Sequence, residues 1–253
     1  MLAFTPEEPE WGLMELADYL DLPKSTVHRA VVNLEVRGLL ERNEVTGKYR
    51  LGLKLFELGM RAGRNMDLRV AARPYLEKLS EQTGEMIALA ILSDDEVLYL
   101  DVVHSSKALR AASAAGQRRP LHCTAVGKVL LGGLPQYEVV RIAEKTGLPP
   151  RTRYSITDAE RLFEDVSQIK KQNYALDLEE FEEGLCCVAA PIMDEANKIA
   201  ASIGVSGPLT RFDEETRPNI IQLMQSAAQA ISRELGYTGS LVQAVTEKSS
   251  ISS

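Results

Sequence analysis

The feature that most constrains this chain is a pair of short amphipathic stretches separated by a tight break near the N-terminus. Apolar residues recur at helical spacing over 13–20, stop before Pro23, and resume at the same spacing over 27–34. Pro23 lacks an amide N–H and disfavours helix in the residue before it, while Ser25 suits the first turn of a second helix. The pattern therefore predicts two helices joined by a tight turn, with Gly38 ending the second helix.

A hairpin and a longer helical stretch follow the two helices. Residues 39–52 alternate around a turn in which Gly47 supplies the positive φ that a hairpin loop needs. We interpret this hairpin as a wing beside the helix pair. Residues 53–83 have helical periodicity, and Pro74 is expected to kink or restart that helix, which predicts an interdomain connection here.

The rest of the chain mixes short strands with helices. Strands are predicted for residues 87–92, 96–103, 108–113, 175–181, 186–194 and 198–207. Helices are predicted to open at Thr124 and to cover 136–145, 158–172 and 220–235. This mixture is typical of an α+β domain in which helices pack on an antiparallel sheet.

These elements predict a two-domain organisation. We assign 1–54 to the helix-turn-helix and wing, 55–67 to a linker helix, 68–238 to a second domain and 239–253 to a disordered, Ser-rich tail. Residues 13–64 hold nine Lys or Arg against seven Asp or Glu, a balance of +2, whereas the remainder holds twenty against twenty-nine, a balance of −9. Any contact with nucleic acid is therefore expected near the N-terminus.

The composition excludes several classes of protein. The chain has no apolar run of about 18 residues and no signal-peptide pattern, so we expect a cytoplasmic protein without a membrane partner. Its three cysteines, Cys123, Cys186 and Cys187, form neither a disulfide framework nor a CxxC metal motif. No cofactor is expected, and the EEFEE segment at 179–183 is interpreted as a solvated acidic turn rather than a metal site, because no histidine lies near it.

The second helix of the pair has the residue types of a DNA-reading element. If Val27, Ala30, Val31 and Leu34 face the core, helical geometry exposes the opposite side to solvent. Arg can bond guanine bidentately, and cations at the helix start and on the wing suit backbone phosphates. The predicted DNA contacts are Lys24, Ser25, Thr26, His28, Arg29, Asn33, Lys48 and Arg50. The alternative is a mere packing unit, but the order helix, turn, helix and hairpin favours DNA binding.

At this point the sequence resembles the IclR family of bacterial regulators. LMELADYLDLPKSTVHRAVVNLEVRGLLER and TGKYRLGLKLFELG are similar to the family's helix-turn-helix, wing and linker start. GQRRPLHCTAVGKVLL and YALDLEEFEEGLCCVAAPIMDEANKIAASIGVSGP are similar to its effector-domain signatures. The resemblance implies a GAF-like effector domain, homodimers or homotetramers, and palindromic double-stranded operators. Only LAF precedes the acidic loop, so most of the family's first helix is expected to be lacking.

The resemblance also implies an effector pocket. Strand alternation places Ser202, Gly204 and Ser206 on one face, where small residues leave room for a ligand. The pocket residues that the family signatures imply are Thr124, Ala125, Gly127, Asp177, Cys187 and Ser206. Backbone N–H groups at 124–127 could hold a carboxylate, and Asp177 could accept from a hydroxyl, which fits a small hydroxy or keto acid. Because Asp177 would repel a carboxylate, aromatic or neutral ligands stay open.

The sequence therefore predicts a ligand-responsive transcription regulator, more often a repressor than an activator, of a catabolic operon. One alternative is an enzyme that uses Cys187 with Asp177 and a base from His104 or His122. A further alternative is an interaction module that no longer binds DNA. We favour the regulator, because no enzyme accounts for the helix-turn-helix and wing.

Overall fold

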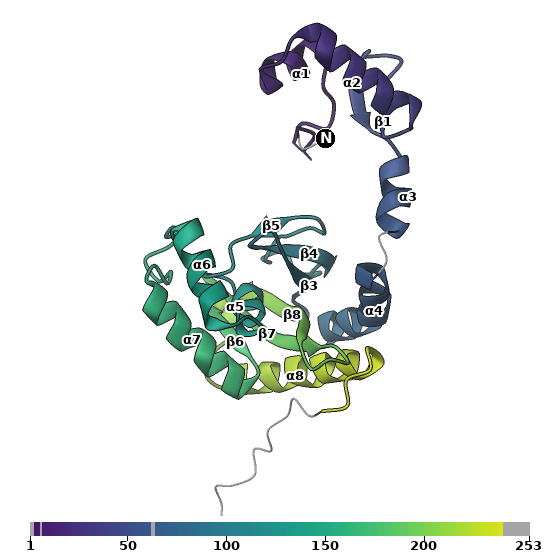
Figure 1. The fold of residues 1–253 in the computed structure, drawn as a ribbon. Coiled ribbons are helices and arrows are strands. Elements are labelled where there is room, and N and C mark those ends of the chain that lie inside the picture. Colours follow the sequence, from purple (N-terminus) through teal and green to yellow (C-terminus); the bar gives the residue numbers. More distant parts are fainter. Residues whose placement is uncertain (1–2, 6, 62–63, 240–253) are drawn as a thin grey trace, which may run out of the picture. The chain divides into compact units, whose positions relative to one another are not determined.

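The computed structural model describes residues 3–5, 7–61 and 64–239, and it divides into two compact units between Met66 and Asp67 (Figure 1). The elements of the N-terminal unit are α1 (Leu13–Leu20), α2 (Lys24–Val36), β1 (Leu40–Arg42), β2 (Tyr49–Leu51) and α3 (Lys54–Arg61). Among the described residues α1 is the first helix, and Ala3 ahead of it is buried in the same core. All of the predicted tail except its first residue lies outside the described residues.

The predicted helix pair and its break are confirmed. Leu16 of α1 packs against Val27 and Val31 of α2, and all three side chains are at most 4% exposed. The residue after α1 adopts the left-handed conformation and Pro23 caps α2, so the chain turns sharply between the helices. The prediction that Ala30 faces the core is wrong: Ala30 is exposed, because it lies at the edge of the stripe that Val27 and Val31 define.

The predicted wing is also present. Strands β1 and β2 pair antiparallel, with Leu40 opposite Leu51, and Gly47 in their loop has φ +69°. Trp11 pairs with β2 through an isolated antiparallel bridge. Its N–H donates to the Tyr49 carbonyl at 2.9 Å, and its carbonyl accepts the Tyr49 N–H at 2.8 Å. This arrangement fixes the wing beside the helix pair.

The helical stretch predicted over 53–83 forms two helices instead of one. Helix α3 ends at Arg61, α4 spans Arg64–Thr83, and the residues between them lie outside the described part of the chain. Helix α4 does not restart at Pro74 but continues through it. One face of α4 is apolar and packs in the core, where Leu68, Ala72, Leu76 and Leu79 are buried and Tyr75 packs beside them.

A six-stranded antiparallel sheet forms the centre of the C-terminal unit, as the sequence predicts. Its strands are β3 (Met86–Ser93), β4 (Glu96–Val103), β5 (Arg118–Arg119), β6 (Ala175–Leu178), β7 (Leu185–Met193) and β8 (Ile199–Pro208). Their order across the sheet is β5-β4-β3-β8-β7-β6, and every neighbouring pair is antiparallel. The α+β class is therefore confirmed.

The strand predicted over 108–113 is absent. Residues 108–113 form an irregular loop, and the edge partner of β4 is the short strand β5 instead. This loop contributes Ala111, Ala112 and Ser113 to the lining of a pocket. Small alanine and serine side chains have weak strand preference, which leaves the segment free to cover that pocket.

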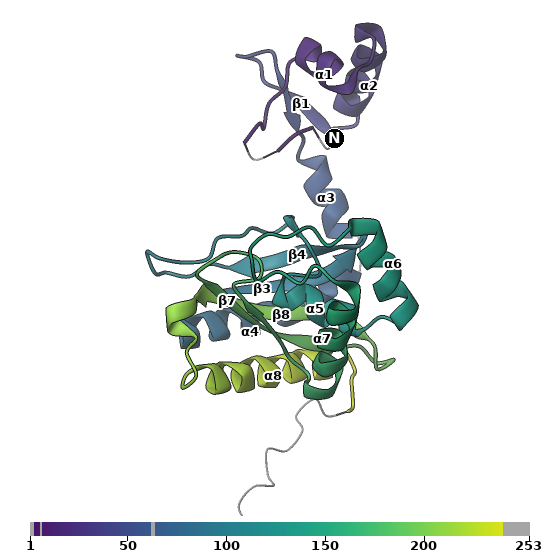
Figure 2. The same ribbon diagram turned by 90° about the vertical axis from the view of Figure 1, so that its left-hand side faces the viewer.

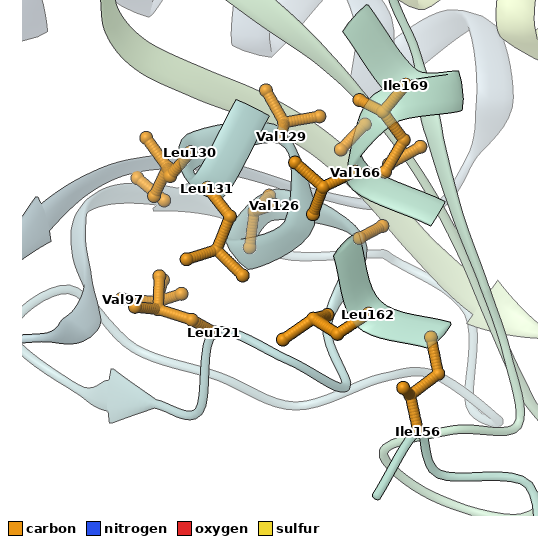
Figure 3. Packing of buried hydrophobic residues seen from close by; sticks show 14 of the residues in the cluster. Val97, Leu121, Val126, Val129, Leu130, Leu131, Ile156, Leu162, Val166 and Ile169 are labelled. Atoms are coloured by element: carbon orange, nitrogen blue, oxygen red, sulfur yellow. The ribbon is translucent and has the colours of Figure 1, made fainter. Parts of the chain in front are cut away.

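Helices cover both faces of the sheet (Figure 2). One face carries α5 (Ala125–Gly132), α6 (Gln136–Thr146) and α7 (Ala159–Gln172), and the other carries α4 and α8 (Arg217–Glu234), which follows the 3-10 turn Leu209–Arg211. Along β3, Ala88 faces the α5 side, whereas Ile87 and Leu89 face α4 and α8. Figure 3 shows the α5 side, where Val129 and Leu131 pack against Val166 and Leu162 of α7.

Candidate functional site

The first candidate site is the exposed surface of α2. Val27 and Val31 anchor one side of this helix in the core, and the other sides face solvent. The six DNA contacts predicted on the helix, Lys24, Ser25, Thr26, His28, Arg29 and Asn33, are all exposed. Among the described residues, Lys24 and Arg29 form no ion pair, so both positive charges are available to an anionic partner.

Asn33 is the least available of the predicted DNA contacts. Its Nδ2 donates to the carbonyl of Arg29 at 2.9 Å, and Arg37 Nη1 donates to the Asn33 carbonyl and side-chain oxygens at 3.1 and 3.3 Å. The amide is therefore bonded within its own helix. A base contact by Asn33 would require these exposed bonds to break.

The two cations predicted on the wing are paired with carboxylates. Lys48 Nζ lies 2.8 Å from Glu15 of α1, and Arg50 Nη2 lies 3.2 Å from Glu41 on the facing strand. Both pairs are exposed, and exposed ion pairs add little to stability, so a phosphate can replace the carboxylate at little cost. Sequence reasoning missed Arg42, an exposed wing cation whose guanidinium lies 5.9 Å from the Tyr49 ring centre.

The second candidate site is a pocket between the N-terminus of α5 and the sheet. Its cavity has a volume of about 50 Å³ and opens to solvent. Five of the six predicted effector residues line it: Thr124, Ala125, Asp177, Cys187 and Ser206. The sheet register explains the convergence, because Asp177 lies opposite Cys187, Cys187 opposite Ser206 and Ser206 opposite Met86. Residues directly opposite on neighbouring strands share one face of the sheet.

Gly127, the sixth predicted residue, does not line the pocket. Thr124 caps α5: its Oγ1 accepts the N–H of Gly127 at 3.2 Å and donates to the carbonyl of Pro120 at 2.7 Å. A Cβ on Gly127 would lie 2.6 Å from the Cα of Leu121, so glycine permits this close approach. The N–H of Gly127 is thus used by the cap, and among the described residues the N–H groups of Ala125 and Val126 remain unbonded.

Asp177 is the acidic group of the pocket. Its side chain is 1% exposed, and its Oδ1 accepts the N–H groups of Glu180 and Phe181 at 2.8 and 3.3 Å. Its Oδ2 is buried and accepts no hydrogen bond of good geometry within the described chain. Burial raises the pKa of Asp177 to about 6, against the lowering effect of these N–H donors and of the nearby Lys128.

A buried charged cluster lies behind Asp177. Lys128 Nζ on α5 lies 2.6 Å from Glu180 Oε1 and 2.8 Å from Asp165 Oδ2 on α7, and Lys128 is 2% exposed. Burial lowers the pKa of Lys128, but the two carboxylates outweigh it and the pKa is raised. Burial raises the pKa of Glu180 to about 7. The prediction of a solvated acidic turn is therefore wrong for Glu180, although Glu182 and Glu183 are exposed.

The arrangement does not support nucleophilic chemistry at Cys187. Burial, reinforced by Asp177, raises the pKa of this thiol well above its ordinary value, so the thiolate is disfavoured. Neither of the two histidines considered as bases lines the pocket: His122 Nε2 lies 3.1 Å from the Pro149 carbonyl, in another cavity, and His104 is exposed. A nucleophile and its base are therefore not brought together.

Sequence reasoning missed three large residues of the pocket. Tyr99 of β4, Arg119 of β5 and Phe181 after β6 all line it, and the guanidinium of Arg119 lies 5.5 Å from the Phe181 ring centre. Arg151 approaches the same ring at 4.9 Å. A signal was available for Arg119, which lies five residues before Thr124 in the motif GQRRPLHCTAVGKVLL.

Two other kinds of site were sought in the described part of the chain. No group of three His, Cys, Asp or Glu side chains there is arranged to hold a metal ion. None of the described helices combines the length and apolar character needed to cross a membrane.

Comparison with known proteins identifies the two units. The family "Bacterial transcriptional regulator IclR C-terminal" matches residues 60–233, and the "IclR helix-turn-helix domain" matches residues 1–44. The chain is 38% identical over 231 residues to the HTH-type transcriptional regulator KdgR of Escherichia coli (strain K12), which covers 91% of this chain and 88% of KdgR. It is 34% identical over 234 residues to XynR of the same organism, which covers 92% of this chain and 93% of XynR.

Solved structures agree with this assignment. An IclR homolog from Microbacterium hydrocarbonoxydans, complexed with 4-hydroxybenzoate, superposes with a TM-score of 0.85 at 26% identity, covering 93% of this chain and 95% of the homolog. The matched families and relatives are transcriptional regulators, so the interpretation as a regulator rather than an enzyme is confirmed. The two family matches together span most of the sequence, and the chain therefore belongs to the IclR family of bacterial transcriptional regulators.

Proposed function

We propose that this regulator is a cytoplasmic repressor of a catabolic operon and that a small hydroxy or keto acid is its effector. In this proposal residues 1–54 read the operator, 55–67 connect the units and 68–238 hold the effector. The observation that carries the effector class is the buried Oδ2 of Asp177, which has only the weak Cys187 thiol beside it as a donor, in the same pocket as the unbonded N–H groups of Ala125 and Val126.

The pocket offers complementary groups to a molecule that carries both a carboxylate and a hydroxyl. The two N–H groups at the start of α5 lie at the positive end of the helix dipole and suit a carboxylate. Asp177 Oδ2 suits a hydroxyl donor, and the guanidinium of Arg119 adds positive charge that offsets repulsion between Asp177 and the ligand. The Microbacterium hydrocarbonoxydans homolog binds 4-hydroxybenzoate, which carries both groups and supports this assignment by similarity.

On the DNA side, we assign base reading to the exposed surface of α2. Arg29 is suited to bond the O6 and N7 of a guanine, whereas Lys24 at the helix start and Lys48 and Arg50 on the wing suit phosphates. The absence of an ion pair at Arg29 in the described chain supports its role, because no bond must break before it reaches a base.

A homodimer on a palindromic operator, or a tetramer built from such dimers, is the assembly we propose. Leu53, just before α3, and Phe56 in its first turn are 68% and 63% exposed, although both are large apolar side chains. Such side chains close together on a surface are typical of a protein interface. A two-fold dimer would place its recognition helices about 34 Å apart, one turn of DNA, or a multiple of it.

The experiment that tests this function is fluorescence anisotropy with DNA that flanks the chain's own gene, over a salt series and with a panel of hydroxy and keto acids. We expect sequence-specific binding that weakens steeply with salt and changes in the presence of one acid. Arg29→Ala should lose about 1–3 kcal/mol of discrimination between operator and scrambled DNA. Asp177→Asn should leave binding without acid unchanged but weaken the response to the acid at least about tenfold, the loss expected for a charged hydrogen bond.

Lys171→Ala is the matched control, because Lys171 is an exposed cation at the end of α7, far along the chain from the DNA-reading surface. Lys171→Ala should change neither the discrimination between operator and scrambled DNA nor the response to the acid. Equal affinity of the wild-type chain for operator and scrambled DNA would contradict the base-reading role of α2. Failure to bind any DNA at low salt would favour the interaction module instead.

A further inference from the structure

We propose that the C-terminal unit holds a second ligand site, separate from the effector pocket, that takes a small neutral aromatic molecule with one hydrogen-bond donor. The site is a cavity bounded by α5, α6, α7 and the segment 120–122, with a volume of about 140 Å³. It shares no lining residue with the effector pocket. The inference therefore goes beyond the proposed function and stands without it.

The walls of this cavity are apolar. Leu121, Leu131, Ile142, Leu148 and Leu162 line it, and each is at most 4% exposed. Leu131 and Leu162 point toward one space in Figure 3. The cavity is partly open to solvent. An apolar cavity of roughly 150 Å³ in another protein binds benzene. A volume of this size thus selects a single ring.

Most polar side chains at the cavity are already bonded. Asp95 lies 2.7 Å from Arg141 Nη2 and 2.7 Å from Lys145 Nζ, and Glu96 lies 3.3 Å from Arg118 Nη1. The hydroxyl of Thr146 donates to the carbonyl of Ile142 at 2.8 Å. These groups therefore require no hydrogen bond from a ligand. The carboxylates of Asp95 and Glu96 also disfavour a negatively charged ligand in the cavity.

His122 is the exception. It is 3% exposed, and its Nε2 lies 3.1 Å from the carbonyl of Pro149, which can only accept, so Nε2 carries the proton. Burial lowers the pKa of His122, which keeps the ring neutral. Its Nδ1 is then an acceptor without a partner in the described chain. An apolar cavity with one free acceptor matches an aromatic ring with one hydroxyl, of which phenol is the simplest.

A ligand in this cavity would contact the same short segment that shapes the effector pocket. Pro120, Leu121 and His122 line the second cavity, whereas Arg119 and Thr124 line the effector pocket. Thr124 Oγ1 bonds the Pro120 carbonyl and ties the two ends of the segment together. The two sites are thus neighbours along the chain, although different residues line them.

The test uses the full chain with methyl-labelled Leu, Ile, Val and Ala, titrated with phenol and separately with benzene. We expect saturable shifts of the Leu131 and Ile142 methyl signals, while Ala88 and Val126 of the effector pocket stay unchanged. Phenol should bind about two- to tenfold more tightly than benzene, as one net hydrogen bond predicts. Absence of saturable shifts, or shifts confined to the effector pocket, would overturn the proposal without any mutation.

Two variants sharpen the test. His122→Leu should lower the affinity for phenol to that for benzene, because the acceptor is gone while the cavity remains. Leu162→Phe should fill the cavity and abolish binding of both molecules, with circular dichroism used to verify that the variant folds. Ser206→Leu, which fills the effector pocket, is the matched control and should leave phenol binding intact. Loss of phenol binding in Ser206→Leu and its retention in Leu162→Phe would place phenol in the effector pocket and refute the second site.

Discussion

Asp177→Asn should change how the stability of this protein depends on pH. Asp177 is 1% exposed, and Lys128, the cation behind it, already contacts Glu180 and Asp165. Burial therefore raises the pKa of Asp177 from its ordinary value of 3.8 to about 6. The folded state then holds a proton that the unfolded chain releases, so ionisation of Asp177 destabilises the fold as the pH rises through its folded pKa.

The size of this effect follows from the two pKa values. At pH 8 the carboxyl is ionised in both the folded and the unfolded chain. At pH 5, one pH unit below the folded pKa, it is protonated in the folded state and still ionised in the unfolded chain, which favours folding by about 1.4 kcal/mol. Asparagine is neutral at both pH values. The free energy of unfolding of the wild-type chain, relative to Asp177→Asn, should therefore rise by about 1.4 kcal/mol from pH 8 to pH 5.

Urea unfolding of both proteins at the two pH values, followed by circular dichroism of the helix-rich C-terminal unit, measures this difference. Asp95→Asn is the matched control. Arg141 and Lys145 hold the pKa of Asp95 below its ordinary value of 3.8, so its contribution is present above that value and is lost only at lower pH. The control difference should thus be flat between pH 8 and pH 5. A flat profile for Asp177→Asn as well would refute the argument that Asp177 is buried without an adequate countercharge.

Two further changes test the surroundings of Asp177. Lys128→Met leaves Glu180 and Asp165 without their cation, so at pH 8 the free energy of unfolding should fall by about 3–5 kcal/mol in urea titrations. The loss should be smaller at pH 5, where Glu180, with a pKa of about 7, is protonated; an equal loss at both pH values would contradict this. Thr124→Ala removes the cap of α5 and should lower the free energy of unfolding by about 0.5–2 kcal/mol, whereas Thr157→Ala, outside any helix, should not.

The local elements were predictable because their causes lie within a few residues of sequence. The apolar stripe of α2 and the break at Pro23 act over one or two helical turns, and both appear in the structure. The strand predicted at 108–113 failed because its apolar spacing says nothing about whether an edge of the sheet is free, and β5 occupies that edge. The helix does not restart at Pro74 for a similar reason, since packing of α4 on the sheet outweighs the single missing N–H.

Predicting the pocket required information that the periodicity of the sequence does not contain. Asp177, Cys187 and Ser206 meet because three strands pair in one register, and the family resemblance, not the spacing, singled them out. The pairing of Lys128 with Glu180, 52 positions along the chain, had no local signal, and Glu180 was therefore placed in solvent. Arg119 was missed although it lies in the motif that contains Thr124, and Phe181 was missed because nothing in the pattern shows that the segment after β6 lines the same pocket.

The unfavourable burial of Asp177 is itself informative about the pocket. An asparagine could accept the same N–H groups of Glu180 and Phe181 without the penalty of a buried negative charge. Buried groups that lower stability without local compensation are characteristic of functional positions. The carboxylate has one property that the amide lacks: a second oxygen, Oδ2, that accepts hydrogen bonds only and whose one neighbouring donor in the described chain is the weak thiol of Cys187. A ligand hydroxyl is the group that would satisfy that oxygen, which is why the acid, rather than its more stable amide, fits an effector site.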